Sequence, residues 1–253
     1  MINRAQLVLI QKQRYRGVSL GALEKDYIIA VVLRAMYADD NLRQVLVLKG
    51  GTALHKLYLG LRLSLDIDFT AHRPMALDEL KPAVEVAGIS GRVKDHRLFS
   101  DALTIQRLGY VGPLDFPNSI KIDVSFREPV LLPPLTQPFA TPYFDPFPVI
   151  AMRLEEILAE KLRATLMRSA PRDVYDLWAV LTQREVDTSG VFELLPRKLA
   201  TVGMVFDEAV LWSNLSAAGR TWEQELRPLV HETPDFQRVA AELRECLAGR
   251  SWT

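Results

Sequence analysis

Hydrophobic and polar positions alternate with a period of two in residues 64–70, which read SLDIDFT. Apolar side chains at every second position alternate there with Asp66, Asp68 and Thr70. This period predicts a β-strand with one buried face, and it places both carboxylates on the same side of the sheet. Two carboxylates about 7 Å apart along one strand suit the binding of divalent metal ions.

A short apolar run at 45–48 precedes this strand and ends at Lys49, Gly50 and Gly51. A short helical pattern follows, with apolar side chains at positions 54, 57 and 58. Glycines that open a helix let backbone N–H groups approach a phosphate closely. The glycine pair and the two aspartates together predict a combined metal and nucleotide site.

Helical spacing and turn signals predict further helices at 3–16, 20–37 and 74–86, and strands at 89–98, 103–111 and 119–127. Ser19 is the expected N-cap of the helix at 20–37, whose first turns hold Glu24 and Asp26. Two interpretations of these acids remain open, a solvent-exposed helix start or a functional cluster. In the last strand the alternation places Lys121 and Asp123 on the polar face, which makes Asp123 a candidate third carboxylate beside the metal.

Seven prolines lie between residues 129 and 148. Because proline lacks a backbone N–H, this density argues against a helix or an inner strand, and we interpret the stretch as an extended connector. Helical periodicity dominates beyond it, with candidate helices at 153–168, 171–182, 189–199, 205–217, 220–230 and 235–248. The expected organisation is an α/β domain at 1–128, a connector at 129–148 and a helical domain at 149–253.

The helix expected at 153–168 carries Lys161 within its apolar stripe. The positions three and four residues away hold no acid, so Lys161 has no ion-pair partner on its own helix. A lysine directed inward either extends its ammonium group to the surface or meets an anion. We favour the second interpretation, with a nucleotide phosphate as the anion.

The next helix begins at residues 169–176, SAPRDVYD, where a capping serine and an early proline mark its start. Asp173 has a structural interpretation as a first-turn acid that complements the helix dipole. Arg172 and Asp176, four residues apart, also have a structural interpretation, as a surface ion pair. Because this helix follows Lys161 and the Asp-x-Asp strand, we favour a role in the site.

The composition is that of an ordinary globular protein, with 49% hydrophobic residues, 25% charged residues and no net charge. A neutral chain binds nucleic acid only through a local basic surface, for which the candidates are Arg92, Lys94, Arg97, Arg163, Arg168 and Arg172. The single cysteine, Cys246, excludes an internal disulfide framework. A charged N-terminus and the absence of an apolar run of about 18–20 residues predict a cytoplasmic protein without a membrane span.

Five segments occur in order along the chain: KGGTAL (49–54), RLSLDIDF (62–69), IKIDVSF (120–126), EEILAEKLRA (155–164) and RDVYDL (172–177). With the upstream EKDY (24–27), this set resembles the AbiEii/AbiGii toxin family of nucleotidyltransferases. The resemblance implies an α+β fold, with a nucleotidyltransferase-like mixed sheet flanked by helices and followed by an all-helical C-terminal domain.

The resemblance also implies an activity and partners. The expected reaction moves a nucleoside monophosphate from an NTP onto an acceptor, which in some family members is the 3′ end of tRNA. The expected partner is an AbiEi-type antitoxin with a winged-helix domain.

Residue roles follow from the same matching segments. Gly51 and Thr52 are expected to hold the triphosphate, and Asp66 and Asp68 to bind Mg²⁺ in a two-ion site. Lys161 is expected to neutralise phosphate charge, with an aspartate of RDVYDL, Asp173 in preference to Asp176, completing the site. The further candidates are Asp123 as a metal ligand, and Lys49, Gly50, Ser64 and Asp176 at the nucleotide. Thr52 stands where the superfamily usually has serine, and it keeps the hydroxyl.

The residues also fit three other functions. DIDFT (66–70) also resembles a phosphatase signature in which the first aspartate is the nucleophile, although that motif normally ends a strand near the chain start. A nucleotidyltransferase of this fold can instead modify a protein or a small molecule. The chain can also be a catalytically silent binding module, although loss of function usually removes the acids that are present here.

Overall fold

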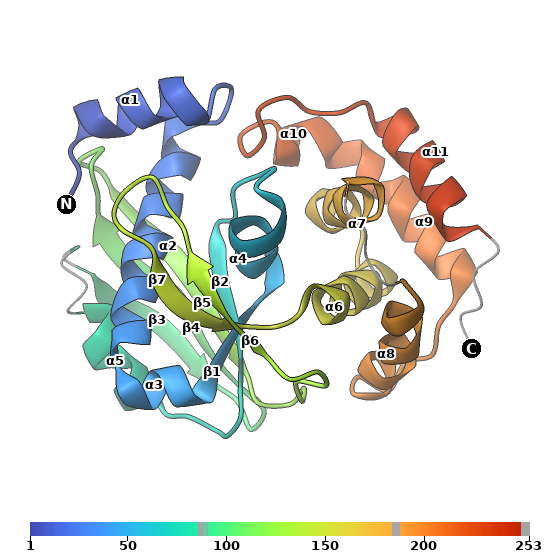
Figure 1. The fold of residues 1–253 in the computed structure, drawn as a ribbon, viewed down its shortest axis with the longest axis horizontal. Coiled ribbons are helices and arrows are strands. Elements are labelled where there is room, and N and C mark those ends of the chain that lie inside the picture. The colour runs from blue at the N-terminus through green and yellow to red at the C-terminus, as the bar shows by residue number, and fades with distance from the viewer. Residues whose placement is uncertain (86–88, 90, 184–187, 249–253) are drawn as a thin grey trace. The chain divides into compact units, whose positions relative to one another are not determined.

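The computed structural model describes residues 1–85, 89, 91–183 and 188–248. The chain divides into two compact units, Met1–Met152 and Arg153–Thr253. The first unit contains a sheet with flanking helices, and the second consists of helices (Figure 1). The α+β fold class expected from the sequence is confirmed.

Seven strands of the described residues form one mixed sheet in the order β3-β4-β5-β2-β1-β7-β6. Their bounds are β1 Leu46–Lys49, β2 Asp66–Ala71, β3 Arg92–Leu98, β4 Ala102–Val111, β5 Pro117–Ser125, β6 Leu135–Phe139 and β7 Phe147–Ala151. The pairs β2–β5 and β1–β7 are parallel, whereas the other neighbours are antiparallel. The strands predicted at 89–98, 103–111 and 119–127 are present, although β3 begins only at Arg92 and β5 ends at Ser125. Position 90 lies outside the described residues.

The period-two prediction for β2 is confirmed. Ile67 and Phe69 are fully buried, whereas Asp66 and Asp68 are partly exposed. Strand β5 alternates in the same way, with Asp123 on its partly exposed face. In the parallel β2–β5 pair Asp68 lies opposite Asp123, so the acids of both strands share one face.

The helices of the first unit are α1 Arg4–Arg14, α2 Leu20–Ala38, α3 Asp40–Val45, α4 Gly50–Ala53, the π-helix η1 Leu54–Leu59 and α5 Leu77–Glu85. Ser19 caps α2 as predicted, because its Oγ accepts a hydrogen bond from the N–H of Ala22. Helix α2 is buried along most of its length and packs against β5, β7 and α5 (Figure 1). The predicted helix at 74–86 begins later, at Leu77, and its predicted last residue, Val86, lies outside the described residues.

The proline-rich stretch is only partly the extended connector that we expected, because β6 and the first two residues of β7 lie within it. The two strands pair with each other, and Pro138 lies opposite Pro148. Strand β6 forms an edge of the sheet, and β7 pairs with β1 only where Leu48 lies opposite Ala151. The prolines therefore lie where no inner-strand N–H is needed, which is where strands tolerate them.

The second unit consists of α6 Leu154–Met167, α7 Pro171–Gln183, α8 Thr188–Ala200, α9 Glu208–Ala218, the 3₁₀ turn η2 Gly219–Thr221, α10 Trp222–Leu226 and α11 Phe236–Leu247. Helix α6 packs against α7, α8 and α9, and α11 packs against α7. The helix predicted at 220–230 is shorter, because α10 ends before Pro228, whose ring is incompatible with a continuing helix. None of the helices described is long and apolar enough to cross a membrane.

Candidate active site

Asp68 lies directly against Gly50 in the first unit. Gly50 begins α4 with a φ of +68°, a left-handed conformation that glycine adopts without strain. An ideal Cβ built at Gly50 would lie 2.2 Å from Oδ2 of Asp68. The carboxylate is therefore held against the backbone of the glycine turn, at a position where only a residue without a side chain fits.

Thr52 connects α4 to the strand that carries the acids. Its hydroxyl donates a 2.6 Å hydrogen bond to the backbone oxygen of Asp66, and the residue is fully buried. An ideal Cβ at Gly51 would lie 3.0 Å from both the Ser64 hydroxyl and Nη2 of Arg62. Arg62 was not singled out in the sequence analysis, although it begins the RLSLDIDF segment, and its buried guanidinium group lies at the glycine turn.

Asp123 is the β5 neighbour of Asp68, as the alternation predicted, and both of its oxygens are bound by groups of the first unit. Thr104 donates a 2.6 Å hydrogen bond to Oδ1, and Nζ of Lys121 lies 2.5 Å from Oδ2. Asp123 thus brings a third carboxylate to the row of acids, together with a lysine that offsets its charge.

Asp68 is paired with Asp123 on one side of β2 and with Lys49 of β1 on the other side. The ammonium nitrogen of Lys49 lies 3.7 Å from Oε2 of Glu128, which is buried. Glu128 follows the end of β5, where the alternation of the strand no longer applies, so the sequence pattern offered no signal for this acid.

The donor groups of the first unit suit a cation such as Mg²⁺. Asp66 and Asp68 supply hard carboxylate oxygens from one strand face, which is the ligand type that Mg²⁺ prefers. Among the described residues, no three His, Cys, Asp or Glu side chains are grouped closely enough to enclose a metal ion. Two carboxylates fit an ion that takes its remaining ligands from substrate phosphates and water, as Mg²⁺ commonly does.

The interpretation of Glu24 and Asp26 as a solvent-exposed helix start is wrong, because both are 1% exposed. Oδ2 of Asp26 lies 2.6 Å from Nζ of Lys56 and accepts a 2.9 Å hydrogen bond from the Tyr143 hydroxyl. Burial and the nearby Asp26 raise the pKa of Tyr143, so the phenol remains a donor. Because Lys56 lies in η1, which continues from α4, Asp26 anchors the helix that follows the glycine turn.

In the second unit Lys161 is bound by two acids of the neighbouring helix. Its ammonium nitrogen lies 2.8 Å from Oδ1 of Asp173 and 2.7 Å from Oδ2 of Asp176. The lysine side chain is 11% exposed, and those of Asp173 and Asp176 are 3% and 0% exposed. The spacing on α6 excluded an acid partner only within that helix, and α7 supplies the acids.

Asp173 also accepts a 2.7 Å hydrogen bond from Nε of Arg168. Burial by itself would raise the pKa of Asp173, but the charges of Lys161 and Arg168 outweigh it and lower the pKa below its ordinary value. Arg172 lies 3.8 Å from Glu225. The RNA-binding candidates at 168 and 172 therefore each have an acid partner in the second unit.

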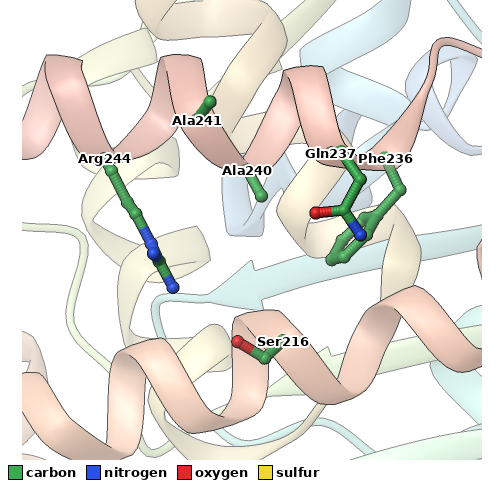
Figure 2. A pocket seen from close by; sticks show the side chains of 6 residues that line it. All are labelled: Ser216, Phe236, Gln237, Ala240, Ala241 and Arg244. Atoms are coloured by element: carbon green, nitrogen blue, oxygen red, sulfur yellow. The ribbon is translucent and has the colours of Figure 1, made fainter.

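A cavity of about 510 Å³ lies between α9 and α11. Figure 2 shows Gln237 and Arg244 extending from α11 toward the helix that carries Ser216. None of the residues that line this cavity is a predicted site residue.

The family of the chain is identified by comparison with known proteins. A family model described as "Nucleotidyl transferase AbiEii toxin, Type IV TA system" matches residues 32–246. The chain belongs to the AbiEii family. It is accordingly a nucleotidyltransferase and a toxin of a type IV toxin–antitoxin system, for which the family implies an NTP substrate, an antitoxin and generally a divalent metal. No curated protein sequence matches the chain.

Solved structures show the same fold. The chain is similar to MenT4, a nucleotidyltransferase toxin from Mycobacterium tuberculosis, with a TM-score of 0.73 and 23% identity over 98% of this chain and 89% of that one. It is also similar to JHP933 from Helicobacter pylori, with a TM-score of 0.62 and 20% identity over 90% and 91% of the two chains. At these sequence identities the structural similarity shows the fold of this AbiEii chain, and it does not identify the acceptor of the reaction.

Proposed function

We propose that this AbiEii toxin is a Mg²⁺-dependent enzyme that transfers a nucleoside monophosphate from an NTP onto the 3′ end of tRNA. The observation that carries the proposal is the contact between Asp68 and Gly50, together with the hydrogen bond from Thr52 to Asp66. These contacts make the acidic strand and the glycine turn one structural unit. Such a unit can hold a phosphate chain and its counter-ion at the same place.

In the proposed reaction a hydroxyl of the acceptor attacks the α-phosphorus of the NTP. The new bond joins that oxygen to phosphorus, and the bond between the α-phosphorus and the bridging oxygen of pyrophosphate breaks. Mg²⁺ bound by Asp66 and Asp68 would offset charge on the attacking and leaving oxygens. Asp123, whose oxygens are bound by Thr104 and Lys121, would accept the hydroxyl proton and would not serve as a third ligand of the ion.

The triphosphate would be held by the glycine turn. Backbone N–H groups at Gly50 and Gly51 are suited to the β- and γ-phosphates, with Lys49 and Ser64 nearby. Arg62, whose Nη2 lies next to Gly51, adds a fixed positive charge where charge develops on the leaving pyrophosphate.

Lys161 would neutralise further phosphate charge during transfer. Its ammonium group is oriented by two buried carboxylates, so it is held in position before substrate arrives. Both acids orient the lysine, and we propose Asp173, which Arg168 also binds, in preference to Asp176 as the acid that completes the site.

The test is incubation of the purified protein with each α-labelled NTP, MgCl₂ and total tRNA, followed by separation of the products on a denaturing gel. We expect a labelled band at tRNA length that disappears with a chelator and in Asp66→Asn and Asp68→Asn. Asp101→Asn is the matched control, because it removes a charge from an exposed acid between β3 and β4. Full transfer by Asp68→Asn would refute the assignment of the acids.

The nature of the labelled product tests the acceptor separately. Label in protein or in a small molecule would replace tRNA as the acceptor while leaving the nucleotidyltransferase assignment intact. The antitoxin is proposed to be of the AbiEi type. Co-expression of such a protein should restore growth to cells that this toxin arrests, and persistent arrest would contradict that pairing.

A further inference from the structure

The strand order restricts where the acceptor can approach. In-line transfer places the attacking hydroxyl and the leaving pyrophosphate on opposite sides of the phosphorus. In the order β3-β4-β5-β2-β1, the glycine turn follows β1 and the metal-binding acids lie on β2. With the leaving phosphates at Gly50 and Gly51, the acceptor has to arrive from the side of β5, β4 and β3.

A row of paired residues crosses the sheet on that side. From β1 to β3 the row consists of Lys49, Asp68, Asp123, Thr104 and Arg97. Directly paired residues point to the same face of a sheet. Arg97 therefore shares the face of Asp68, three strand spacings or about 14 Å away.

Two more cations of β3 lie on this face. Arg92 is paired with Gly109, which is paired with Ser119, and Ser119 lies on the same face of β5 as Asp123. An ideal Cβ at Gly109 would lie 2.4 Å from Cε of Lys94. The Lys94 side chain thus lies over β4 on the face that carries the acids.

These three cations, Arg92, Lys94 and Arg97, are exposed, and β3 forms the edge of the sheet. The acids nearby do not cancel their charge. Asp95 is the only acid in β3, Glu85 of α5 lies 3.5 Å from the N–H of Val93, and the carboxylate of Asp123 is already bound by Lys121. The three cations therefore outnumber the two acids at β3. The outer face of β3 and β4 therefore carries an excess of positive charge beside the row that leads to Asp68.

We propose that this basic face, defined by Arg92, Lys94 and Arg97, binds the phosphate backbone of the single-stranded acceptor end of RNA. The inference rests on the proposed function, in which the acceptor is RNA. Arginine and lysine side chains on an open strand face suit a phosphate backbone, because such contacts need charge and reach but no base pairing. The bound strand would run toward β5 and present its terminal hydroxyl next to Asp68.

The test compares the full-length wild type with the triple variant Arg92→Ala/Lys94→Ala/Arg97→Ala. Total tRNA and a short single-stranded RNA are the probes, and affinity is measured by fluorescence anisotropy over a range of salt. The charge-matched control is Arg4→Ala/Lys12→Ala/Arg14→Ala, which removes three exposed cations from α1. Mg-NTP binding and thermal unfolding of each variant show whether the nucleotide site and the fold are intact.

We expect the β3 variant to bind RNA at least about 10-fold more weakly, with an unchanged affinity for Mg-NTP. The slope of log affinity against log salt should become shallower by about 2, from three contacts at about 0.7 each. If the β3 variant binds RNA with the same affinity and salt slope as the α1 control, RNA does not bind at the basic face of β3. The proposed function would still stand in that case if the wild type transfers the nucleotide to RNA. Transfer by the wild type to protein instead of RNA would overturn both.

Discussion

Gly50→Ala offers a sharp test of the glycine turn, because the structure predicts both the strain and the collision. The new Cβ would lie 2.2 Å from Oδ2 of Asp68, whereas ordinary contacts begin at 3.4 Å, so the carboxylate must retreat by about 1.2 Å. A displacement of about 1 Å at a reacting centre can lower the rate about 100-fold. We therefore expect kcat/KM to fall by at least that factor, which corresponds to about 2.7 kcal/mol in the barrier.

The same substitution also strains the backbone, and a second glycine separates the two effects. Gly60 has a φ of +73°, close to the +68° of Gly50, but an ideal Cβ there meets nothing within 4 Å. Both alanine variants should lose about 1–2 kcal/mol from the left-handed conformation, which lowers Tm by a few degrees in a chain of this size. Gly60→Ala should nevertheless retain nearly full transfer.

The assay is the initial rate of transfer from an α-labelled NTP, measured beside thermal unfolding of both variants. Equal activity of Gly50→Ala and Gly60→Ala at equal Tm would refute the reasoning, because it would mean that the Asp68 carboxylate does not need its position against the glycine turn.

Three further predictions concern side chains that the site holds in place. Lys161→Met removes the ammonium group between two buried carboxylates, leaving Asp173 with Arg168 alone, and should destabilise the second unit by about 3–5 kcal/mol. Adding Asp173→Asn and Asp176→Asn should recover much of that stability in thermal unfolding without restoring transfer, and an active triple variant would contradict the role of the lysine. Thr52→Val should lose about 1 kcal/mol in urea unfolding, because it removes the hydrogen bond that the buried hydroxyl donates to the backbone oxygen of Asp66, whereas Thr52→Ser should stay close to wild type. The lowered pKa of Asp173 predicts that its contribution to stability is present above the ordinary value of 3.8 and is lost as pH falls through the folded value. Unfolding midpoints between pH 6 and pH 2 check this, and Asp173→Asn should show a weaker dependence on pH.

Local patterns in the sequence predicted the strands and helices near the site well. The alternation in SLDIDFT correctly placed Asp66 and Asp68 on one face, because side chains along a strand point to opposite faces in turn. The same rule placed Asp123 correctly on the partly exposed face of β5. The argument from proline density failed at 129–148, because proline excludes only inner, fully paired strand positions, and whether a strand lies at an edge is decided by its neighbours.

Residues whose partners lie far along the chain were less predictable. For Asp26, in an early turn of α2, the sequence left a solvent-exposed and a functional interpretation open, and the structure shows it buried against Lys56 and Tyr143. Lys161 has no acid within reach on α6, yet α7 supplies two. Neither pairing has a fixed spacing in sequence, so no periodicity indicates it.

The sequence by itself determined the elements that carry the acids, the faces of their strands and the family, because these depend on neighbouring residues and on motifs that can be matched in order. Only the tertiary structure decided that Asp68 lies against Gly50, that Arg62 reaches the glycine turn and that the cations of β3 share the face of the acids. The physical reason is that strand order and register, which set these contacts, depend on hydrogen bonds between segments far apart in the chain.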